Sequence, residues 1–239
     1  MKAMILAAGL GTRLKPFTDK HPKALVTING KTLLQRNIEY LASYGIKEII
    51  VNVHHFADQI IDLVKTNNGF SSSVTFSDEV AEVLETGGGI KRASRFFEKE
   101  KEPFVVMNVD ILTDMNLKEM IEQHNKNKPL ATLAITSRVT SRYFLFDEWN
   151  HLCGWENEKT GERKISRESK SYIKKAFSGI HVISPNVFPL IKMNGKFSMV
   201  DVYLELAKTQ LIEAFDHSNS KFIDVGKPES IEKAEILFT

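Results

Sequence analysis

The sequence predicts an α/β fold, a Rossmann-like and mainly parallel sheet flanked by helices, with an inserted antiparallel hairpin region. Short apolar runs alternate with amphipathic stretches of helical period, as in strand–helix–strand units. Residues 3–8 (AMILAA) and 104–107 (FVVM) are continuous apolar runs, typical of strands buried on both faces. Between residues 137 and 175 two short strands around a polar turn (DEWN) indicate the hairpin instead.

The individual elements follow in chain order. After the first strand and a loop, an amphipathic helix begins near Leu33 and should end at Gly45, since glycine is favoured just past a helix. Pro228 opens the last helix, because proline suits a first turn. The charge-dense residues 156–170 lack periodicity and are predicted to form a loop. The other predicted elements are strands at 49–53, 74–76, 131–135, 143–146, 152–155, 176–183 and 222–225, and helices at 57–66, 86–97, 117–127 and 199–208.

Composition excludes several classes of protein. The 239 residues are 42% hydrophobic and 26% charged, which is ordinary for a globular chain. The single Cys153 excludes a disulfide scaffold and a cysteine-based zinc site, and predicts a reduced, cytoplasmic protein. Thirty-two basic against 30 acidic residues are too balanced for a nucleic-acid partner. No apolar run approaches the roughly 20 residues of a membrane span, and MKAMILAAG is too short for a signal peptide.

A glycine-rich loop follows the first strand, and its composition indicates a phosphate site. Gly9 and Gly11 allow the backbone to approach a ligand closely, and exposed N–H groups there can bind phosphate oxygens. Thr12 adds a hydroxyl donor, while Arg13 and Lys23 add cations that can bracket a polyphosphate. Leucine stands where the dinucleotide fingerprint needs its third glycine, and no G-x4-G-K-[ST] segment occurs. A dehydrogenase and a P-loop enzyme are therefore disfavoured.

Two aspartates follow predicted strands, at the edge where parallel sheets bind ligands. Asp110 follows the FVVM run, and Asp224 ends the FID segment. Carboxylates placed in this way suit Mg²⁺, with triphosphate oxygens and water completing the octahedron. Asp114 is a rival ligand, although a cap for the helix near residue 117 is its more ordinary role. The sequence therefore predicts a Mg²⁺ site at Asp110 and Asp224.

Residues Thr86, Gly87, Gly88 and Gly89 open a predicted helix. Each glycine costs a helix about 1 kcal/mol against alanine, so a purely structural explanation is poor. We expect a nucleobase or ribose to lie flat on this backbone, with an ordinary glycine-rich loop as the alternative. Polar side chains that stay open for base selection are Asn52, His54 and Glu85.

The remaining candidates have more ordinary explanations. His54 and His55 are adjacent in a strand, so their side chains point to opposite faces and do not form a metal pair. Trp149 and Trp155 are expected to pack in the hairpin region rather than stack on a base. The run 159–170 is expected to be a solvated loop, with a mobile substrate lid as the alternative.

Five segments, in order, resemble the sugar-1-phosphate nucleotidyltransferases. The first is LAAG with G-x-G-x-R and the later Pro22-Lys23. The others are LETGGGI at 84–90, NVD at 108–110, FSGI at 177–180 and IDVGKP at 223–228. LETGGG and FSGI are most similar to the N-acetylmuramate-1-phosphate uridylyltransferases. Short mannose-1-phosphate guanylyltransferases are the second resemblance.

The resemblance implies a single nucleotidyltransferase domain over residues 1–239, with a nucleotide-binding part at 1–136 and a sugar-binding part with closing elements at 137–239. An NTP and a sugar 1-phosphate would give an NDP-sugar and pyrophosphate, with Mg²⁺. Arg13, Lys23 and Asp110 would be catalytic, and Asn108 and Gly179 would face the sugar. The nucleotide would be bound by Leu6, Ala8, Gly9, Gly11, Thr12, Arg13, Lys23, Glu85, Thr86, Gly87 and Gly88, with Gly88 nearest the base.

The implied substrates are UTP and N-acetylmuramate 1-phosphate, as in cell-wall sugar recycling, with GTP and mannose 1-phosphate as the alternative. Two features depart from the uridylyltransferases. Val109 replaces a glycine and is expected to crowd the sugar phosphate, and residues 137–175 are longer, with Tyr143 near a position that is acidic there. An inactive nucleotide-binding regulator should have lost Arg13, Lys23 or one of the two aspartates, Asp110 and Asp224. All four residues are present. The sequence carries no signal of an oligomeric state.

Overall fold

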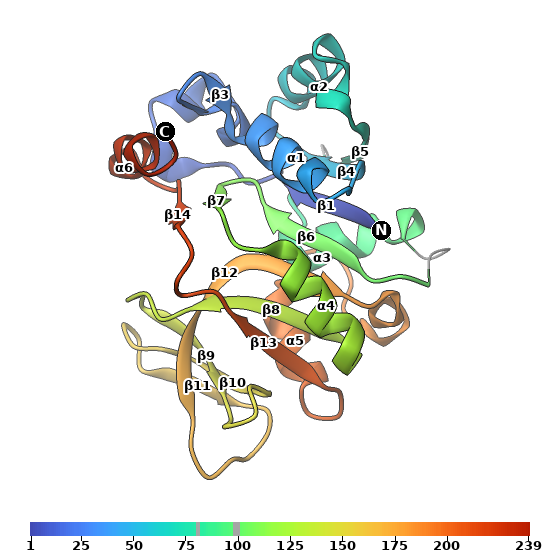
Figure 1. Ribbon diagram of the computed structural model, residues 1–239, viewed down its shortest axis with the longest axis vertical. Coiled ribbons are helices and arrows are strands. Elements are labelled where there is room, and N and C mark those ends of the chain that lie inside the picture. Colours follow the sequence, from blue (N-terminus) through green and yellow to red (C-terminus); the bar gives the residue numbers. More distant parts are fainter. Residues whose placement is uncertain (80–81, 98–100) are drawn as a thin grey trace.

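A mixed sheet runs through the whole structure, a computed structural model that describes residues 1–79, 82–97 and 101–239. Within these residues the main sheet has ten strands in the order β11-β10-β9-β12-β6-β1-β4-β5, with β8 paired to β12 and β13 paired to β8 (Figure 1). The strands are β1 (Lys2–Leu6), β4 (Glu48–Val53), β5 (Ser73–Asp78), β6 (Phe104–Asn108), β8 (Ala131–Thr136), β9 (Arg142–Phe146), β10 (Leu152–Asn157), β11 (Glu162–Ile165), β12 (Ile173–Ile183) and β13 (Ile212–Asp216).

The part of the sheet that carries the glycine-rich loop is parallel, as predicted. β1 lies between β4 and β6 and is parallel to both, with Leu6 beside Asn52 on one side and Asn108 on the other. β5 continues this parallel arrangement beyond β4, and β13 is parallel to β8. Only antiparallel pairing joins β12 to its neighbours. The carboxyl ends of β1, β4 and β6 therefore lie together at one edge, where such sheets bind ligands.

The predicted hairpin is present, and it is larger than predicted. β9 and β10 pair antiparallel, and with β11 they form one end of the main sheet, at the bottom of Figure 1. The predicted loop at 156–170 contains a third strand, β11, which pairs with β10. All four residues of β11, from Glu162 to Ile165, are exposed, so no alternation of buried and polar side chains marks it in the sequence.

Two short two-stranded pairs lie off the main sheet. They join β2 (Thr27–Ile28) to β3 (Lys31–Thr32) and β7 (Ile111–Thr113) to β14 (Phe222–Asp224). The second pair matters for function, because its register places Asp224 opposite Ile111, next to Asp110. The two predicted aspartates are therefore brought together, Asp224 at the end of β14 and Asp110 in the turn before β7, although they are far apart in sequence.

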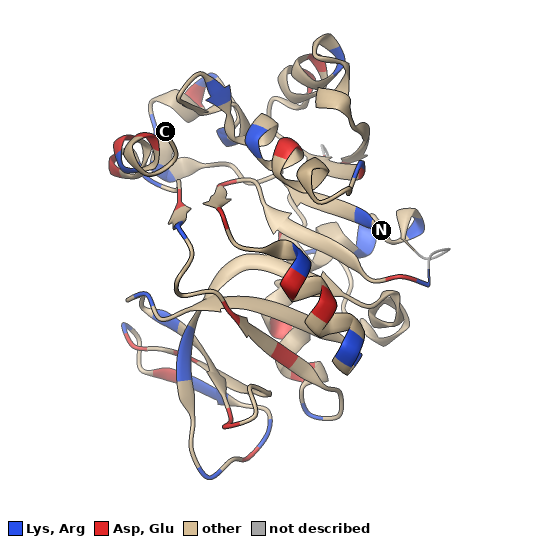
Figure 2. Ribbon diagram, in the orientation of Figure 1, with Lys and Arg blue, Asp and Glu red and all other residues tan. Residues whose placement is uncertain are grey.

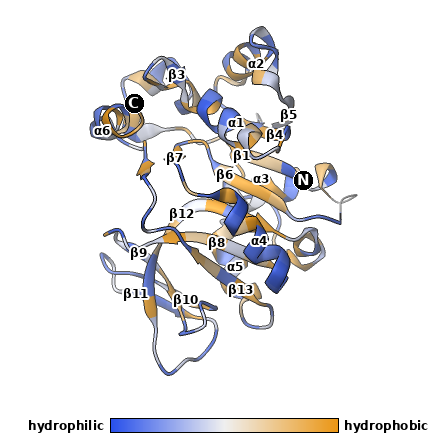
Figure 3. Ribbon diagram, viewed as in Figure 1, coloured by the Kyte–Doolittle hydropathy of each residue, from blue (hydrophilic) through white to orange (hydrophobic). Residues whose placement is uncertain are grey.

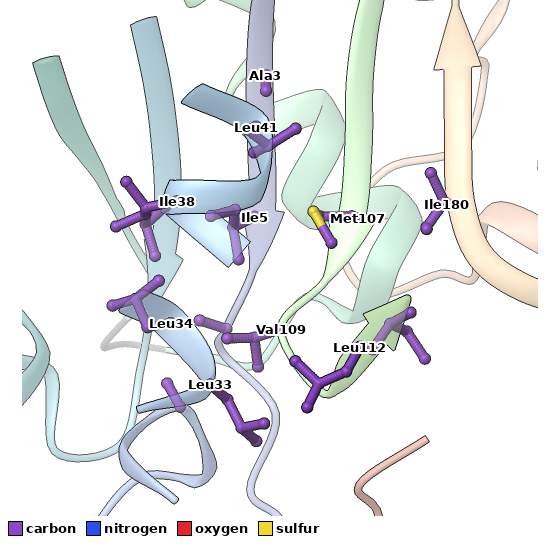
Figure 4. Packing of buried hydrophobic residues seen from close by; sticks show 14 of the residues in the cluster. Ala3, Ile5, Leu33, Leu34, Ile38, Leu41, Met107, Val109, Leu112 and Ile180 are labelled. Atoms are coloured by element: carbon purple, nitrogen blue, oxygen red, sulfur yellow. The ribbon is translucent and has the colours of Figure 1, made fainter. Parts of the chain in front are cut away.

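Helices cover both faces of the sheet, and each face has its own buried cluster. α1 (Leu33–Ser43), α2 (Ala57–Thr66), α4 (Leu117–Asn127) and α6 (Glu229–Leu237) contribute to the cluster on one face, and α3 (Glu85–Arg92) and α5 (Met199–Leu206) to that on the other. β1 contributes to both, with Ala3 and Ile5 on one side and Met4 on the other, as predicted for a strand buried on both faces. Figure 4 shows side chains of α1 over Ala3 and Ile5.

Hydropathy and charge follow this layering. The central strands are mostly apolar, while the outer surfaces of the helices are hydrophilic (Figure 3). Lys, Arg, Asp and Glu gather on helices, turns and the hairpin region (Figure 2). The predicted helix at 86–97 is shorter, because α3 ends at Arg92 and a separate 3₁₀ turn follows at Ser94–Phe96. Among the described residues, no helix has the length and apolar content needed to span a bilayer.

Three histidines are buried inside this fold and are held neutral. His124, His181 and His217 are each 4% exposed or less. Burial lowers the pKa of His124 and His217 to about 4 and that of His181 to about 3. One ring nitrogen of each histidine lies at hydrogen-bond distance from a hydroxyl, the pairs being His124–Thr132 at 2.9 Å, His181–Tyr203 at 2.6 Å and His217–Ser178 at 2.7 Å.

The chain is therefore expected to lose stability in mild acid. Unfolding returns the three pKa values to about 6.5, so the unfolded chain binds about three more protons than the folded one near pH 5. The contribution of these histidines is fully present above pH 6.5 and is lost as the pH falls toward the folded pKa values. Urea unfolding at pH 7.5, 6.5, 5.5 and 5 measures the effect, and a free energy of unfolding that stays constant over this series would contradict it.

Candidate active site

A cavity of about 430 Å³ opens at the carboxyl ends of β1 and β6. Loops after four strands and the start of α3 enclose it, so residues far apart in the sequence meet there. The predicted site residues that line it are Leu6, Ala8, Gly9, Gly11, Arg13, Lys23, Glu85, Thr86, Asn108 and Asp110. Thr12, Gly87, Gly88, Gly179 and Asp224 do not line it.

The glycine-rich loop forms one wall of this cavity. A Cβ atom at Gly9 would meet nothing within 4 Å, so the backbone there is open to a ligand. Gly11 is different, because a Cβ there would lie 2.9 Å from Thr18 Cγ2, and its φ of +62° also favours glycine. The chain then turns through the 3₁₀ segment Thr12–Leu14, which directs Arg13 to the cavity while Thr12 stays exposed.

Lys23 and Asp110 form an ion pair at the base of this wall. Lys23 is only 8% exposed, although it belongs to a loop segment. Its ammonium group is thus a nearly desolvated charge whose partner carboxylate also lines the cavity. Because few water molecules screen such a pair, it interacts strongly with any further charge that enters.

Asp224 lies beside this pair, behind Gly226. A Cβ built at Gly226 would be 2.6 Å from Asp224 Oδ1 and 2.7 Å from Arg13 Nη2, so Gly226 leaves room for both side chains. The backbone N–H of Val225 donates to the Asp110 carbonyl at 2.8 Å, which fixes the two acidic segments together. Burial and the negative charge of Asp110 raise the pKa of Asp224, while Lys23, Arg13 and Arg138 act in the opposite direction.

The chemistry of these groups fits a divalent cation. Asp224 Oδ1 is buried and has no hydrogen-bond partner within the described part of the chain, which is costly unless a positive group satisfies it. The described residues contain no cluster of three or more His, Cys, Asp or Glu side chains suited to a metal. Two carboxylates alone leave several positions of an octahedron for phosphate oxygens and water. The carboxylate of Asp114, the rival metal ligand, instead accepts the Lys221 N–H at 2.7 Å. Asp114 is also not the expected cap of α4, because the N-cap position of that helix is Asn116.

The glycine triplet is packed against protein rather than open to the cavity. The N–H groups of Gly87 and Gly88 both donate to the Phe197 carbonyl, at 2.9 and 3.2 Å. A Cβ at Gly87 would lie 2.5 Å from the Phe197 ring, and one at Gly88 would meet the Gly195 carbonyl oxygen. Gly88 does not line the cavity, and a base on its backbone stays a prediction. Close packing of α3 on the segment before α5 accounts for Gly87 and Gly88, whereas a Cβ at Gly89 would lie 2.6 Å from Glu79 Oε1.

Polar groups next to α3 line the cavity instead. Asn52 and Glu79 are both buried, and Asn52 Nδ2 donates to Glu79 Oε1 at 2.8 Å. Asn52 Oδ1 accepts the N–H of Ala7 at 2.6 Å, which ties the glycine-rich loop to β4. Glu85 has an unusual φ of +58° for a residue with a side chain, and such strain concentrates at functional sites. Glu85 was expected to bind the nucleotide and Asn52 was left open, whereas Glu79 and Ser198 were not predicted; all four line the cavity.

Asn108 and Gly179 lie in contact on the other side of the cavity. Gly179 has φ +73°, and a Cβ there would lie 2.7 Å from Asn108 Nδ2, so only glycine fits. Val109 also lines the cavity, so the expectation that it crowds the sugar phosphate stays a prediction. Its side chain is buried in the same cluster as α1 (Figure 4), and Asn37 Nδ2 donates to its carbonyl at 2.8 Å. In the hairpin region Trp155 packs on the core as expected, but Trp149 is 66% exposed.

Comparisons with known proteins agree with this geometry. A family model described as "Nucleotidyl transferase" matches residues 2–144. HddC from Yersinia pseudotuberculosis, whose crystal structure was solved in complex with GMP-PN, is 32% identical and has a TM-score of 0.80, over 100% of this chain and 99% of that one.

Curated relatives include a mannose-1-phosphate guanyltransferase of Yarrowia lipolytica, 30% identical over 100% of this chain, and a UTP–glucose-1-phosphate uridylyltransferase of Synechocystis sp., 27% identical over 95% of it. The chain spans 64% and 60% of the length of these two relatives. Family model, full-length structural match and cavity geometry agree, and the chain belongs to the nucleotidyl transferase family.

Proposed function

We propose that the chain transfers a nucleotidyl group from an NTP to a sugar 1-phosphate. The observation that carries this proposal is the meeting of Arg13, Lys23 and Asp110 in one cavity, with Asp224 beside them. An oxygen of the sugar phosphate would attack the α-phosphorus of the NTP. The bond from this phosphorus to the oxygen bridging to the β-phosphate breaks, and pyrophosphate leaves with the electron pair. No protein nucleophile is required.

Each residue would contribute charge or position. Two phosphorylated reactants repel each other, so most of the catalysis would come from orientation and charge neutralisation. Arg13 and Lys23 would stabilise the triphosphate and the leaving pyrophosphate. Asp110 and Asp224 would hold Mg²⁺, which supplies charge neutralisation at the α-phosphate when bound. Asn108 and Gly179 would position the sugar. Residues 1–136 would serve mainly the nucleotide and 137–239 mainly the acceptor, with Asn108 and Asp224 as the exceptions.

For the base, we propose guanine, with uracil as the second candidate. HddC was crystallised with GMP-PN and matches this chain over nearly its whole length, and the Yarrowia lipolytica relative is a guanyltransferase. These matches support GTP with mannose 1-phosphate or a closely similar sugar phosphate. The Synechocystis sp. uridylyltransferase supports UTP. The LETGGG and FSGI segments support UTP with N-acetylmuramate 1-phosphate as acceptor.

The decisive experiment measures pyrophosphate release for four NTPs against a panel of sugar 1-phosphates. We expect the highest kcat/KM for GTP with mannose 1-phosphate or a mannose-like relative, at least 10-fold above UTP with the same acceptor, since buried polar groups left unpaired by the wrong base discriminate strongly. A preference for UTP with N-acetylmuramate 1-phosphate would establish the second candidate. Absence of pyrophosphate release with every pair, in the presence of Mg²⁺, would refute nucleotidyl transfer itself.

A further inference from the structure

The part of β12 that carries Gly179 is not held by its neighbouring strands. β12 pairs with β8 at Ala176 and Phe177, and that pairing resumes only at His181. Pairing with β6 begins at Ile180. Ser178 and Gly179 thus have no register partner among the described residues, although Gly179 touches Asn108. Ser178 and Gly179 therefore form a bulge in β12, and contacts other than sheet hydrogen bonds must hold it in place.

Two side chains from other elements hold it. Arg138, in the loop after β8, donates from Nη2 to the Phe177 carbonyl oxygen at 2.9 Å. His217, directly after β13, lies with Nε2 2.7 Å from Ser178 Oγ. Ser178 and His217 are 1% and 4% exposed, so the second contact is fully inside the protein. The bulge is therefore positioned by two side chains: the Arg138 guanidinium group holds Phe177, and the His217 imidazole holds Ser178.

Both side chains also touch the strand that ends at Asp224. The guanidinium carbon of Arg138 lies 5.3 Å from the centre of the Phe222 ring, and the His217 ring lies 5.7 Å from it in an edge-on arrangement. Phe222 is the first residue of β14, and Asp224 is the last. Arg138 and His217 thus connect the Gly179 bulge to the proposed metal ligand through one aromatic ring.

This cluster is not arranged for stability alone. Arg138 Nε and His217 Nδ1 are buried and have no hydrogen-bond partner among the described residues. An unpaired buried donor or acceptor costs roughly 1–3 kcal/mol, so an apolar cluster of similar volume would be the more stable solution. Residues that sacrifice stability in this way are expected where a site needs a defined geometry.

We propose that Arg138, Ser178 and His217 are positioning residues for the acceptor: they hold the Gly179 bulge against Asn108, and hold β14 with it, so that the sugar 1-phosphate meets the metal-bound nucleotide in line. The inference rests on the proposed function, because it takes the Asn108–Gly179 contact to be the sugar side of the cavity. It assigns these three residues to the acceptor and not to the NTP.

The test compares three variants, Ser178→Ala, His217→Leu and Arg138→Met, with a matched control. His124→Leu removes an equally buried histidine–hydroxyl pair, His124 with Thr132, which joins α4 to β8 away from the bulge. We expect the KM for the sugar 1-phosphate to rise on the order of 10-fold in each test variant, with lower kcat, since small misplacements of a reactant are costly. The Kd for the NTP, measured by calorimetry without acceptor, should stay within twofold of wild type. The control should lower Tm but leave both constants unchanged.

Partial rescue adds a readout that a loss of folding would not produce. In His217→Gln the amide can still bond Ser178 Oγ, so its acceptor KM should lie between those of wild type and His217→Leu. An unchanged acceptor KM in Ser178→Ala, which removes a single oxygen and is the least disruptive variant, would overturn the inference even if His217→Leu fails to fold. Equal losses in NTP Kd and acceptor KM would overturn it too. A wild type without transfer activity would instead refute the proposed function.

Discussion

Asp110→Asn and Asp224→Asn are each expected to lower kcat by about 100-fold or more, because either change removes a carboxylate from the proposed Mg²⁺ site. The fold should survive, since asparagine has nearly the same shape, but Asp110→Asn should lower Tm because it leaves the buried Lys23 ammonium group without its partner carboxylate. For Asp224 the substitution also removes a negative charge that burial and Asp110 already disfavour, as its raised pKa indicates. The Tm of Asp224→Asn should therefore equal that of the wild type or rise slightly. Steady-state pyrophosphate release over a Mg²⁺ titration, with Tm measured in parallel, checks both expectations.

Asp114→Asn is the matched control for these substitutions. Its carboxylate accepts the Lys221 N–H, which an amide oxygen can also do, and it does not line the cavity. We expect its kcat to stay within twofold of wild type. Normal turnover in both Asp110→Asn and Asp224→Asn, or full wild-type activity in excess EDTA, would remove the metal pair from the mechanism.

The fold was predictable where one side of an element is buried. α2 and α4 have the predicted limits, because their apolar residues recur at helical spacing and pack on one face of the sheet. β13 was not predicted. Its Glu213 is buried and accepts from Asn127 Nδ2 at 2.9 Å, so a charged residue interrupts the apolar run that would have marked the strand. Only the tertiary partner on α4 makes that glutamate acceptable there.

The site residues were predictable where a short stretch of sequence is enough to indicate their role. The glycine-rich loop and the aspartates after β6 and within β14 are local features at strand ends, and the structure brings them together. The packing of Gly87 and Gly88 could not be predicted, because their contacts with Phe197 and Gly195 lie more than 100 positions away in the sequence. Glu79 was missed for a similar reason, since nothing near it in sequence reveals its hydrogen bond with Asn52.

Lys23→Met is expected to reduce kcat/KM for the NTP by roughly 10- to 150-fold, the equivalent of the 1.5–3 kcal/mol that a charge-assisted hydrogen bond contributes. Lys23 is buried and ion-paired to Asp110, so its ammonium group stands at a fixed position beside the cavity. Methionine keeps the apolar stem and removes only the charge, which limits the structural disturbance. Initial rates at several NTP concentrations, with saturating sugar 1-phosphate, measure the loss.

Lys15→Met is the control for Lys23→Met, because Lys15 belongs to the same loop and pairs with Asp19 at 2.9 Å, but its side chain is 61% exposed. An exposed ion pair of this kind contributes little to stability, about 0–1 kcal/mol. Lys15 does not line the cavity, so the kcat/KM of Lys15→Met should remain near the wild-type value. Arg13→Ala should resemble Lys23→Met in kinetics, although Arg13 is exposed and its loss should hardly change Tm. If Lys23→Met instead lowered Tm sharply without ligand and left kcat/KM unchanged, Lys23 would serve to neutralise Asp110 in the folded chain and not to bind phosphate.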